Sequence, residues 1–149
     1  MTETICELCD TTSGKVLVAS RHWRIIDAAD PAFPGFTRVI WNSHVREMTD
    51  LSAPQRMELL EVVFRVEKVM REYLAPDKVN LASLGNQVPH LHWHVIARWH
   101  DDIAFPAPIW ATPDVDAGKA LLAGQRAAAV MRRLPDYHQA LFNEFNRIP

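Results

Sequence analysis

The sequence has few cysteines, no long hydrophobic run and no excess of basic residues, and each shortage excludes a class of protein. Two cysteines among 149 residues cannot staple a domain of this size with disulfide bonds. No stretch approaches the roughly 20 apolar residues of a membrane-spanning helix. The formal net charge is −2, whereas a protein that binds the phosphate backbone of nucleic acids is usually basic. Nucleic acid is therefore disfavoured as the main partner, although a nucleotide is not.

Length and composition indicate one globular domain over residues 1–149. The composition, 48% hydrophobic and 23% charged, excludes a disordered or low-complexity chain. The first ten residues carry three acidic side chains and no apolar signal core, so we expect a cytoplasmic protein that does not bind membranes. In a reducing compartment, the spacing of Cys6 and Cys9 indicates a metal site or a redox pair rather than a structural disulfide.

Short runs of β-forming residues alternate with turn-forming segments in the first hundred residues. The pattern predicts strands at 15–20, 22–28, 36–41, 79–84 and 90–99. Proline and glycine residues indicate a loop at 30–35 between the second and third of these strands.

Three helices are predicted. Ser52 and Gln55 fit a capping box, and apolar side chains then recur at helical spacing as far as the stop signal at 75–77. Two more helices are expected at 116–134 and 136–145, each capped by the aspartate at its first position. Strands, a long helix, strands and then helices predict an α+β domain with a largely antiparallel sheet.

The most informative segment is 90–96, in which three histidines alternate with apolar residues. Side chains alternate between the two faces of a strand, so His90, His92 and His94 share one face and the residues between them can face a core. Three interpretations are open: histidines with ordinary local partners, a metal site of the His-x-His type, and a phosphate site in which one imidazole is the nucleophile. Strict alternation of three histidines disfavours the first.

This segment resembles the signature of the histidine triad (HIT) superfamily, His-φ-His-φ-His-φ-φ, in which φ is an apolar residue. Other features support the resemblance by their order along the chain: Cys6-x-x-Cys9, His44 before the long helix, Asn80, and Gly85 in the turn before the triad. The Gly-Asn-x-Val-Pro turn is similar to that of a proteobacterial-type branch. The chain departs from the family pattern at Gln87 (usually Ser or Thr), at Ala97 (usually Pro) and at 41–43 (usually containing Pro-Lys).

The resemblance covers about residues 4–102 and implies the HIT fold, an antiparallel sheet of about five strands with the long helix across one face. A helical extension at about 116–146 lies outside it. Family members are typically dimers, so the resemblance also implies a homodimer. The aromatic residues Trp99, Phe105 and Trp110 either cover the site or belong to an interface.

The resemblance implies a nucleotide hydrolase or nucleotidyl transferase that acts at the α-phosphate. His92 would be the nucleophile and form a nucleotidyl-histidine intermediate, which needs no metal. A backbone carbonyl would hold the protonated nitrogen of His92, and His94 would donate a hydrogen bond to a phosphate oxygen or to the leaving group. The implied substrates are dinucleoside polyphosphates, such as diadenosine tetraphosphate, and nucleoside phosphoramidates.

The nucleotide would be bound by residues upstream of the triad. Asn80 and Gln87 are uncharged donors suited to α-phosphate oxygens, and the backbone N–H groups around Gly85 and Asn86 add to them. The early strands and the loop from Asp27 to Gly35 would form the nucleoside pocket, with Asp27 on the ribose hydroxyls. The alternative for Asp27 is an acid that caps the turn at the end of its strand.

The N-terminal cysteines suggest a further site by the same resemblance. Cys6, Cys9, His44 and His90 would bind a structural zinc ion, and the alternative is two reduced cysteines without a metal. Two other functions stay open: a metal-dependent enzyme that uses the row of histidines as ligands, and a nucleotide-binding protein without turnover.

Overall fold

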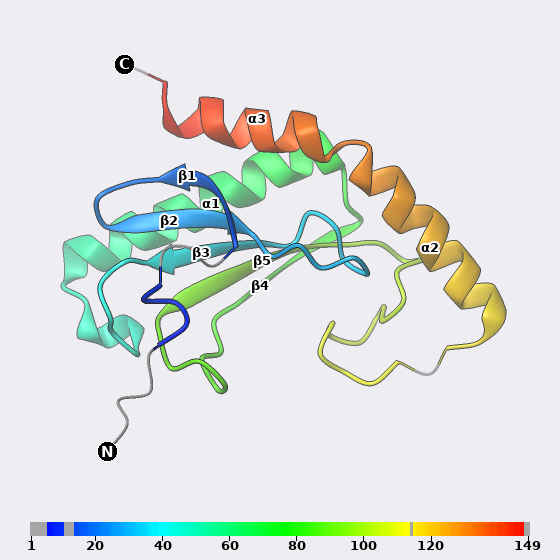
Figure 1. The fold of residues 1–149 in the computed structure, drawn as a ribbon, viewed down its shortest axis with the longest axis horizontal. Coiled ribbons are helices and arrows are strands. Elements are labelled where there is room, and N and C mark those ends of the chain that lie inside the picture. The colour runs from blue at the N-terminus through cyan, green and yellow to red at the C-terminus, as the bar shows by residue number, and fades with distance from the viewer. Residues whose placement is uncertain (1–5, 11–13, 114, 148–149) are drawn as a thin grey trace.

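The computed structural model describes residues 6–10, 14–113 and 115–147, and an antiparallel sheet of five strands lies at its centre (Figure 1). The strands are β1 (Lys15–Ala19), β2 (Trp23–Asp27), β3 (Thr37–Trp41), β4 (Lys78–Ala82) and β5 (His92–Arg98). Their order across the sheet is β1-β2-β3-β5-β4, so β5 lies between β3 and β4. The predicted α+β fold with about five antiparallel strands is confirmed.

The long helix α1 (Ala53–Leu74) begins and ends where the sequence predicts. At its start, the N–H of Gln55 donates to Ser52 Oγ and the N–H of Ser52 donates to Gln55 Oε1, which completes the capping box. At its end, Ala75 adopts a left-handed conformation with φ of +51°, and Pro76 cannot continue a helix. A short 3-10 helix, η1 (Met48–Asp50), precedes α1.

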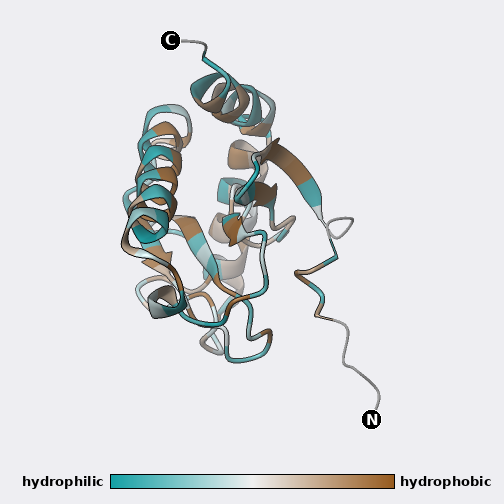
Figure 2. Ribbon diagram, turned by 90° about the vertical axis from the view of Figure 1, so that its left-hand side faces the viewer, coloured by the Kyte–Doolittle hydropathy of each residue, from teal (hydrophilic) through white to brown (hydrophobic). Residues whose placement is uncertain are grey.

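One face of the sheet packs against α1 and forms the main hydrophobic core. From β5, this face carries Trp93, Val95 and Ala97, which alternate with the histidines as predicted. Fully buried side chains of α1, among them Val63 and Val66, join them in this core. Figure 2 shows α1 on one side of the sheet and the N-terminal segment on the other. The face away from α1 is therefore the one that His92 and His94 occupy.

Two C-terminal helices, α2 (Ala117–Met131) and α3 (Leu134–Phe145), lie within the predicted extension. Asp116 caps α2, and its carboxylate accepts the N–H of Lys119 at 2.7 Å, as predicted. The prediction that Asp136 caps the last helix is wrong. That helix begins earlier, because Pro135 fits the first turn, where its missing N–H has no helical acceptor, and Asp136 lies within this turn.

Helix α3 packs against α1 and the edge strand β1. Its Tyr137 is completely buried, and the phenol oxygen lies 2.9 Å from Thr37 Oγ1 of β3. The extension thus closes one end of the main core. In the described part of the chain, no helix combines the length and the apolar character needed to cross a membrane.

Candidate functional site

The structure separates the three histidines of the triad into two groups. His92 and His94 lie on β5, and their side chains occupy the sheet face away from α1. His90 precedes the strand, which begins at His92 rather than at His90 as predicted. The His90 ring is completely buried, and its Nε2 lies 2.6 Å from the carbonyl oxygen of Trp41. His90 nevertheless points to the histidine face, because its neighbour Leu91 packs in the main core and its own ring faces the N-terminal cysteines.

A backbone hydrogen bond fixes the tautomer of His92. Its Nδ1 lies 2.6 Å from the carbonyl oxygen of His90, and a carbonyl can only accept. Nδ1 must therefore carry the proton, which leaves the lone pair on Nε2. This is the carbonyl contact that the resemblance to the HIT superfamily implies for His92. Ser83 Oγ donates to the carbonyl oxygen of His92 at 2.8 Å and ties the strand to the end of β4.

Burial keeps both strand histidines neutral near pH 7. Desolvation lowers the pKa of His92, against the hydrogen bond to His90 that favours its charged form. Desolvation, followed by the nearby His92 and Arg38, lowers the pKa of His94 to about 4. The two rings meet edge to face, with their centroids 4.7 Å apart. A neutral imidazole with a free Nε2 lone pair can act as a nucleophile toward phosphorus.

Both histidines open into a cavity of about 380 Å³. We call this cavity the triad pocket; it is lined by Glu7, Leu8, Arg38, Leu84, Gly85, Asn86, Gln87, Val88, His92, His94 and Trp110. Three of the predicted nucleotide-binding residues, Gly85, Asn86 and Gln87, are thus brought together with the two histidines. Gly85 has a φ of +69°, which a residue with a side chain rarely adopts, so the turn that presents these residues depends on glycine here.

Two predicted binding residues do not line the triad pocket. Asn80 points from the same sheet face, but its Oδ1 accepts a hydrogen bond from Arg98 at 2.8 Å. Asp27 accepts the N–H of Ala29 at 2.8 Å, so it caps the turn at the end of β2, as its alternative interpretation states. None of residues 27–35 lines this cavity, and the nucleoside pocket expected there stays a prediction.

The sequence did not single out several residues of the triad pocket. Arg38 comes from β3, where it is the partner of His94 across the ladder. A charged residue beside the apolar residues of this predicted strand is the sequence feature that could have identified it. Glu7 and Leu8 reach the pocket from the N-terminal segment, which no local pattern places there.

Among the aromatic residues after the triad, Trp110 covers the site. Its ring meets the His94 ring edge to face, with centroids 5.2 Å apart, whereas Trp99 belongs to the main core. A buried ion pair holds the loop that carries Trp110. Arg98 donates to Asp102 at 2.7 and 3.1 Å and to the carbonyl oxygen of Ala107 at 2.8 Å.

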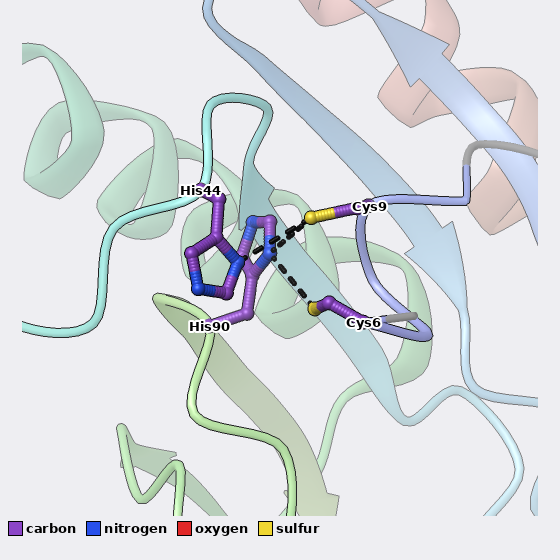
Figure 3. Close-up of side chains that lie close together, drawn as sticks. All are labelled: Cys6, Cys9, His44 and His90. Atoms are coloured by element: carbon purple, nitrogen blue, oxygen red, sulfur yellow. Dashed lines mark hydrogen bonds between the residues drawn. The ribbon is translucent and has the colours of Figure 1, made fainter. Parts of the chain in front are cut away.

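A second group of side chains lies beside the triad pocket. Cys6, Cys9, His44 and His90 converge from the N-terminal segment, the loop after β3 and the segment before β5 (Figure 3). Their ligand atoms all lie within 4.8 Å of one another. The closest pairs are Cys6 Sγ to His90 Nδ1 at 3.4 Å, Cys9 Sγ to His44 Nδ1 at 3.3 Å and Cys9 Sγ to His90 Nδ1 at 3.6 Å.

These distances fit a tetrahedral zinc ion. Bonds of about 2.3 Å to sulfur and about 2.0 Å to nitrogen separate neighbouring ligand atoms by roughly 3.3–3.8 Å. The hydrogen bond from His90 Nε2–H to Trp41 leaves Nδ1 as the ligand atom and orients the ring toward the cysteines. Desolvation and the adjacent Cys6 raise the pKa of Cys9.

The comparisons with known proteins agree with this geometry. The profile of the HIT domain matches residues 11–101, so the chain belongs to the HIT-domain family. No functionally curated protein matches the sequence. Membership supports a nucleotide-binding or nucleotide-hydrolase function in general, since proteins of this family are usually nucleotide hydrolases or transferases, although some are not catalytic.

Solved structures of the family share the fold. A histidine triad protein from Marinobacter aquaeolei is 28% identical, with a TM-score of 0.65 and coverage of 87% of this chain and 92% of that one. A histidine triad protein from Bradyrhizobium japonicum is 27% identical, with a TM-score of 0.61 and coverage of 79% and 88%. A zinc-bound family member from Mycobacterium smegmatis is 21% identical, with a TM-score of 0.56 and coverage of 85% and 94%, and at that identity it shows the fold alone.

The lowered pKa of His94 predicts a loss of stability in acid. The pKa of His94 is about 4 in the folded protein and about 6.5 when unfolded, so the unfolded state binds more protons between these values. This contribution is complete above about pH 6.5 and is lost as the pH falls to about 4. We expect His94 alone to cost about 2 kcal/mol of unfolding free energy between about pH 7 and about pH 5.

Urea unfolding of the wild type and of His94→Asn at these two pH values measures this contribution. The variant lacks the titrating group, so its unfolding free energy should fall by about 2 kcal/mol less than that of the wild type. Equal losses in the two proteins would contradict the low pKa of His94.

Proposed function

We propose that the protein is a nucleotide hydrolase or nucleotidyl transferase that works through a covalent nucleotidyl-His92 intermediate. The observation that carries the proposal is the hydrogen bond from His92 Nδ1–H to the carbonyl oxygen of His90, at 2.6 Å. It leaves the Nε2 lone pair available, in a neutral ring, within a pocket lined by hydrogen-bond donors. These are the requirements for an imidazole that attacks phosphorus.

In the first step, the lone pair of His92 Nε2 forms a bond to the α-phosphorus. The bond from phosphorus to the leaving group breaks, and the leaving group takes that electron pair. His94 lies edge to face with His92 and lines the same pocket, where its ring is placed to interact with the phosphate or the leaving group. In the second step, an oxygen of water or of another acceptor bonds to phosphorus and loses its proton to solvent, and the bond from phosphorus to Nε2 breaks, which returns its electron pair to Nε2.

The turn before the triad supplies donors for the phosphate. Gln87 and the backbone N–H groups near Gly85 and Asn86 border the pocket beside His92. Fixed donors around a phosphate favour the transition state, in which charge on the equatorial oxygens increases. The proposed substrates are dinucleoside polyphosphates and nucleoside phosphoramidates, and the proposed chemical step uses no metal.

The rival proposal, a metal held by the row of histidines, is disfavoured by the positions of the rings. His90 faces the two cysteines, and Nδ1 of His92 is occupied by a carbonyl oxygen. In the described part of the chain, the group that can hold a metal is instead the Cys6, Cys9, His44 and His90 set.

We propose that this set binds a structural zinc ion, as the distances among the four ligand atoms suggest. The ion would fix the N-terminal segment against the sheet, with no part in the reaction. The name of the Mycobacterium smegmatis relative states that it binds zinc, which is consistent with this assignment. The homodimer and the cytoplasmic location stay predictions.

Mass spectrometry of the intact protein tests the covalent intermediate. Brief incubation with diadenosine tetraphosphate or with an adenosine phosphoramidate, followed by acid-free quenching, should add the mass of one nucleotidyl group to the wild-type chain. The adduct should map to His92 and be missing from His92→Asn. An adduct on another residue, or a wild-type chain that hydrolyses these substrates without any adduct in rapid-quench samples, would contradict the mechanism.

A further inference from the structure

Arg38 is the one arginine or lysine among the residues that line the triad pocket. It extends from β3 beside His94, its partner across the ladder, and its guanidinium carbon lies 5.2 Å from the centre of the Phe36 ring. Its Nε is buried and has no hydrogen-bond partner among the described residues. A charged donor of this kind, left without an acceptor at the wall of a pocket, is expected to bind an anion.

Asp30 does not form an ion pair with Arg38. Asp30 is the carboxylate whose charge acts on it, but Asp30 Oδ1 accepts the N–H groups of Ala32 and Phe33. Within the described ranges, no ion pair joins Arg38 to a carboxylate.

The two buried arginines of the histidine face have hydrogen-bond acceptors, although Nε of Arg24 lacks one, as Nε of Arg38 does. Arg24 donates to the carbonyl oxygen of Leu8 at 2.6 Å and to Asn42 at 3.1 Å, and Arg98 is paired with Asp102. Arg38 differs from both because its position opens into the triad pocket. Its charge is therefore free to act on a ligand.

We propose that Arg38 binds a second phosphate of the substrate, distinct from the phosphate that His92 attacks. This inference rests on the proposed function and concerns which nucleotides the pocket prefers. The residue opposite His92 in the ladder is Ile40, whereas Arg38 is opposite His94, two residues further along the strand. Same-face residues of a strand are separated by roughly 6.6 Å. The side chain of Arg38 therefore leaves the backbone about that far along the strand from the position opposite His92, which attacks the phosphorus.

The chemistry of arginine suits this role. Its planar guanidinium binds phosphate through two parallel N–H···O bonds, which neutral donors such as Gln87 cannot reproduce. The second phosphate can belong to a polyphosphate chain or to the ribose, and both sources present the same charged group. A pocket with this cation should prefer nucleotides with two phosphates to those with one.

Calorimetry with defined nucleotides tests the proposal. AMP, ADP and adenosine 3′,5′-bisphosphate, and their guanine counterparts, are titrated into protein carrying His92→Asn, which prevents turnover. We expect at least one nucleotide with two phosphates to bind roughly 10- to 100-fold more tightly than the monophosphate. Adding Arg38→Leu should abolish most of this preference, and Arg38→Lys should restore part of it. Arg71→Leu, which removes an exposed arginine from α1, is the control for net charge.

The outcomes distinguish the two sources of the second phosphate, and they separate a failure of this proposal from a failure of the proposed mechanism. Loss of the ADP preference assigns a polyphosphate chain, and loss of the bisphosphate preference assigns a phosphate on the ribose. The proposal is overturned if Arg38→Leu weakens all nucleotides equally or changes none, if Arg71→Leu has the same effect, or if no preference exists. Because binding is measured without turnover, such a failure is distinct from the absence of a His92 adduct.

Discussion

Replacing His92 by alanine should lower the turnover of diadenosine tetraphosphate or an adenosine phosphoramidate by at least about a thousandfold. The substitution removes Nε2, the atom that forms the bond to phosphorus, and no other histidine can replace it. His94 has a different orientation and lacks the carbonyl contact that fixes the tautomer of His92, and His90 faces the cysteines. Nucleotide binding should persist, since the turn at 85–88 and Arg38 remain.

Two further variants separate loss of the nucleophile from loss of structure. His92→Asn keeps an N–H that can donate to the carbonyl oxygen of His90, so it should be as inactive as His92→Ala while retaining more stability. His100→Ala removes an exposed histidine that pairs with Asp77, and it should leave turnover unchanged. If His92→Ala retained more than about a hundredth of wild-type turnover with a native circular dichroism spectrum, another group would have to be the nucleophile.

The second large effect is expected at the cysteines. Protein purified without chelator should contain about one zinc ion per chain, and Cys6→Ser/Cys9→Ser should contain none. The melting temperature of the double variant should fall by an amount on the order of 10 °C, because binding to the folded site stabilises the protein. Elemental analysis and thermal unfolding measure the two effects.

The consequences should extend to the triad pocket. Leu8, between the two cysteines, packs on Ile26 and Ile40 and also lines the pocket, so the ion would fix one wall of the site. Chelator should lower the melting temperature of the wild type toward that of the double variant and leave the variant unchanged. Zinc-free wild-type protein after reconstitution under reducing conditions would refute the metal site, and His90 would then serve only to orient His92 through its carbonyl group.

Local sequence patterns predicted most of the fold, because they act over a few residues. Alternation along 90–99 placed Trp93 and Val95 in the core and His92 and His94 on the other face. Ser52 and Gln55 marked the start of α1, since a capping box needs only neighbouring groups. The same kind of reasoning failed at Asp136, because the cap of α3 is Arg133, three residues earlier, and Pro135 lies in the first turn.

The sequence by itself singled out the candidate site residues: the histidines of 90–94, the turn before them and the cysteine pair. Tertiary structure alone decided how they are grouped, because a side chain's partner is set by strands far away in the chain. The His90 ring contacts Trp41 and Cys6, and Asn80 accepts a hydrogen bond from Arg98. Arg38 enters the pocket because β3 pairs with β5, a neighbourhood that exists only after the sheet has formed.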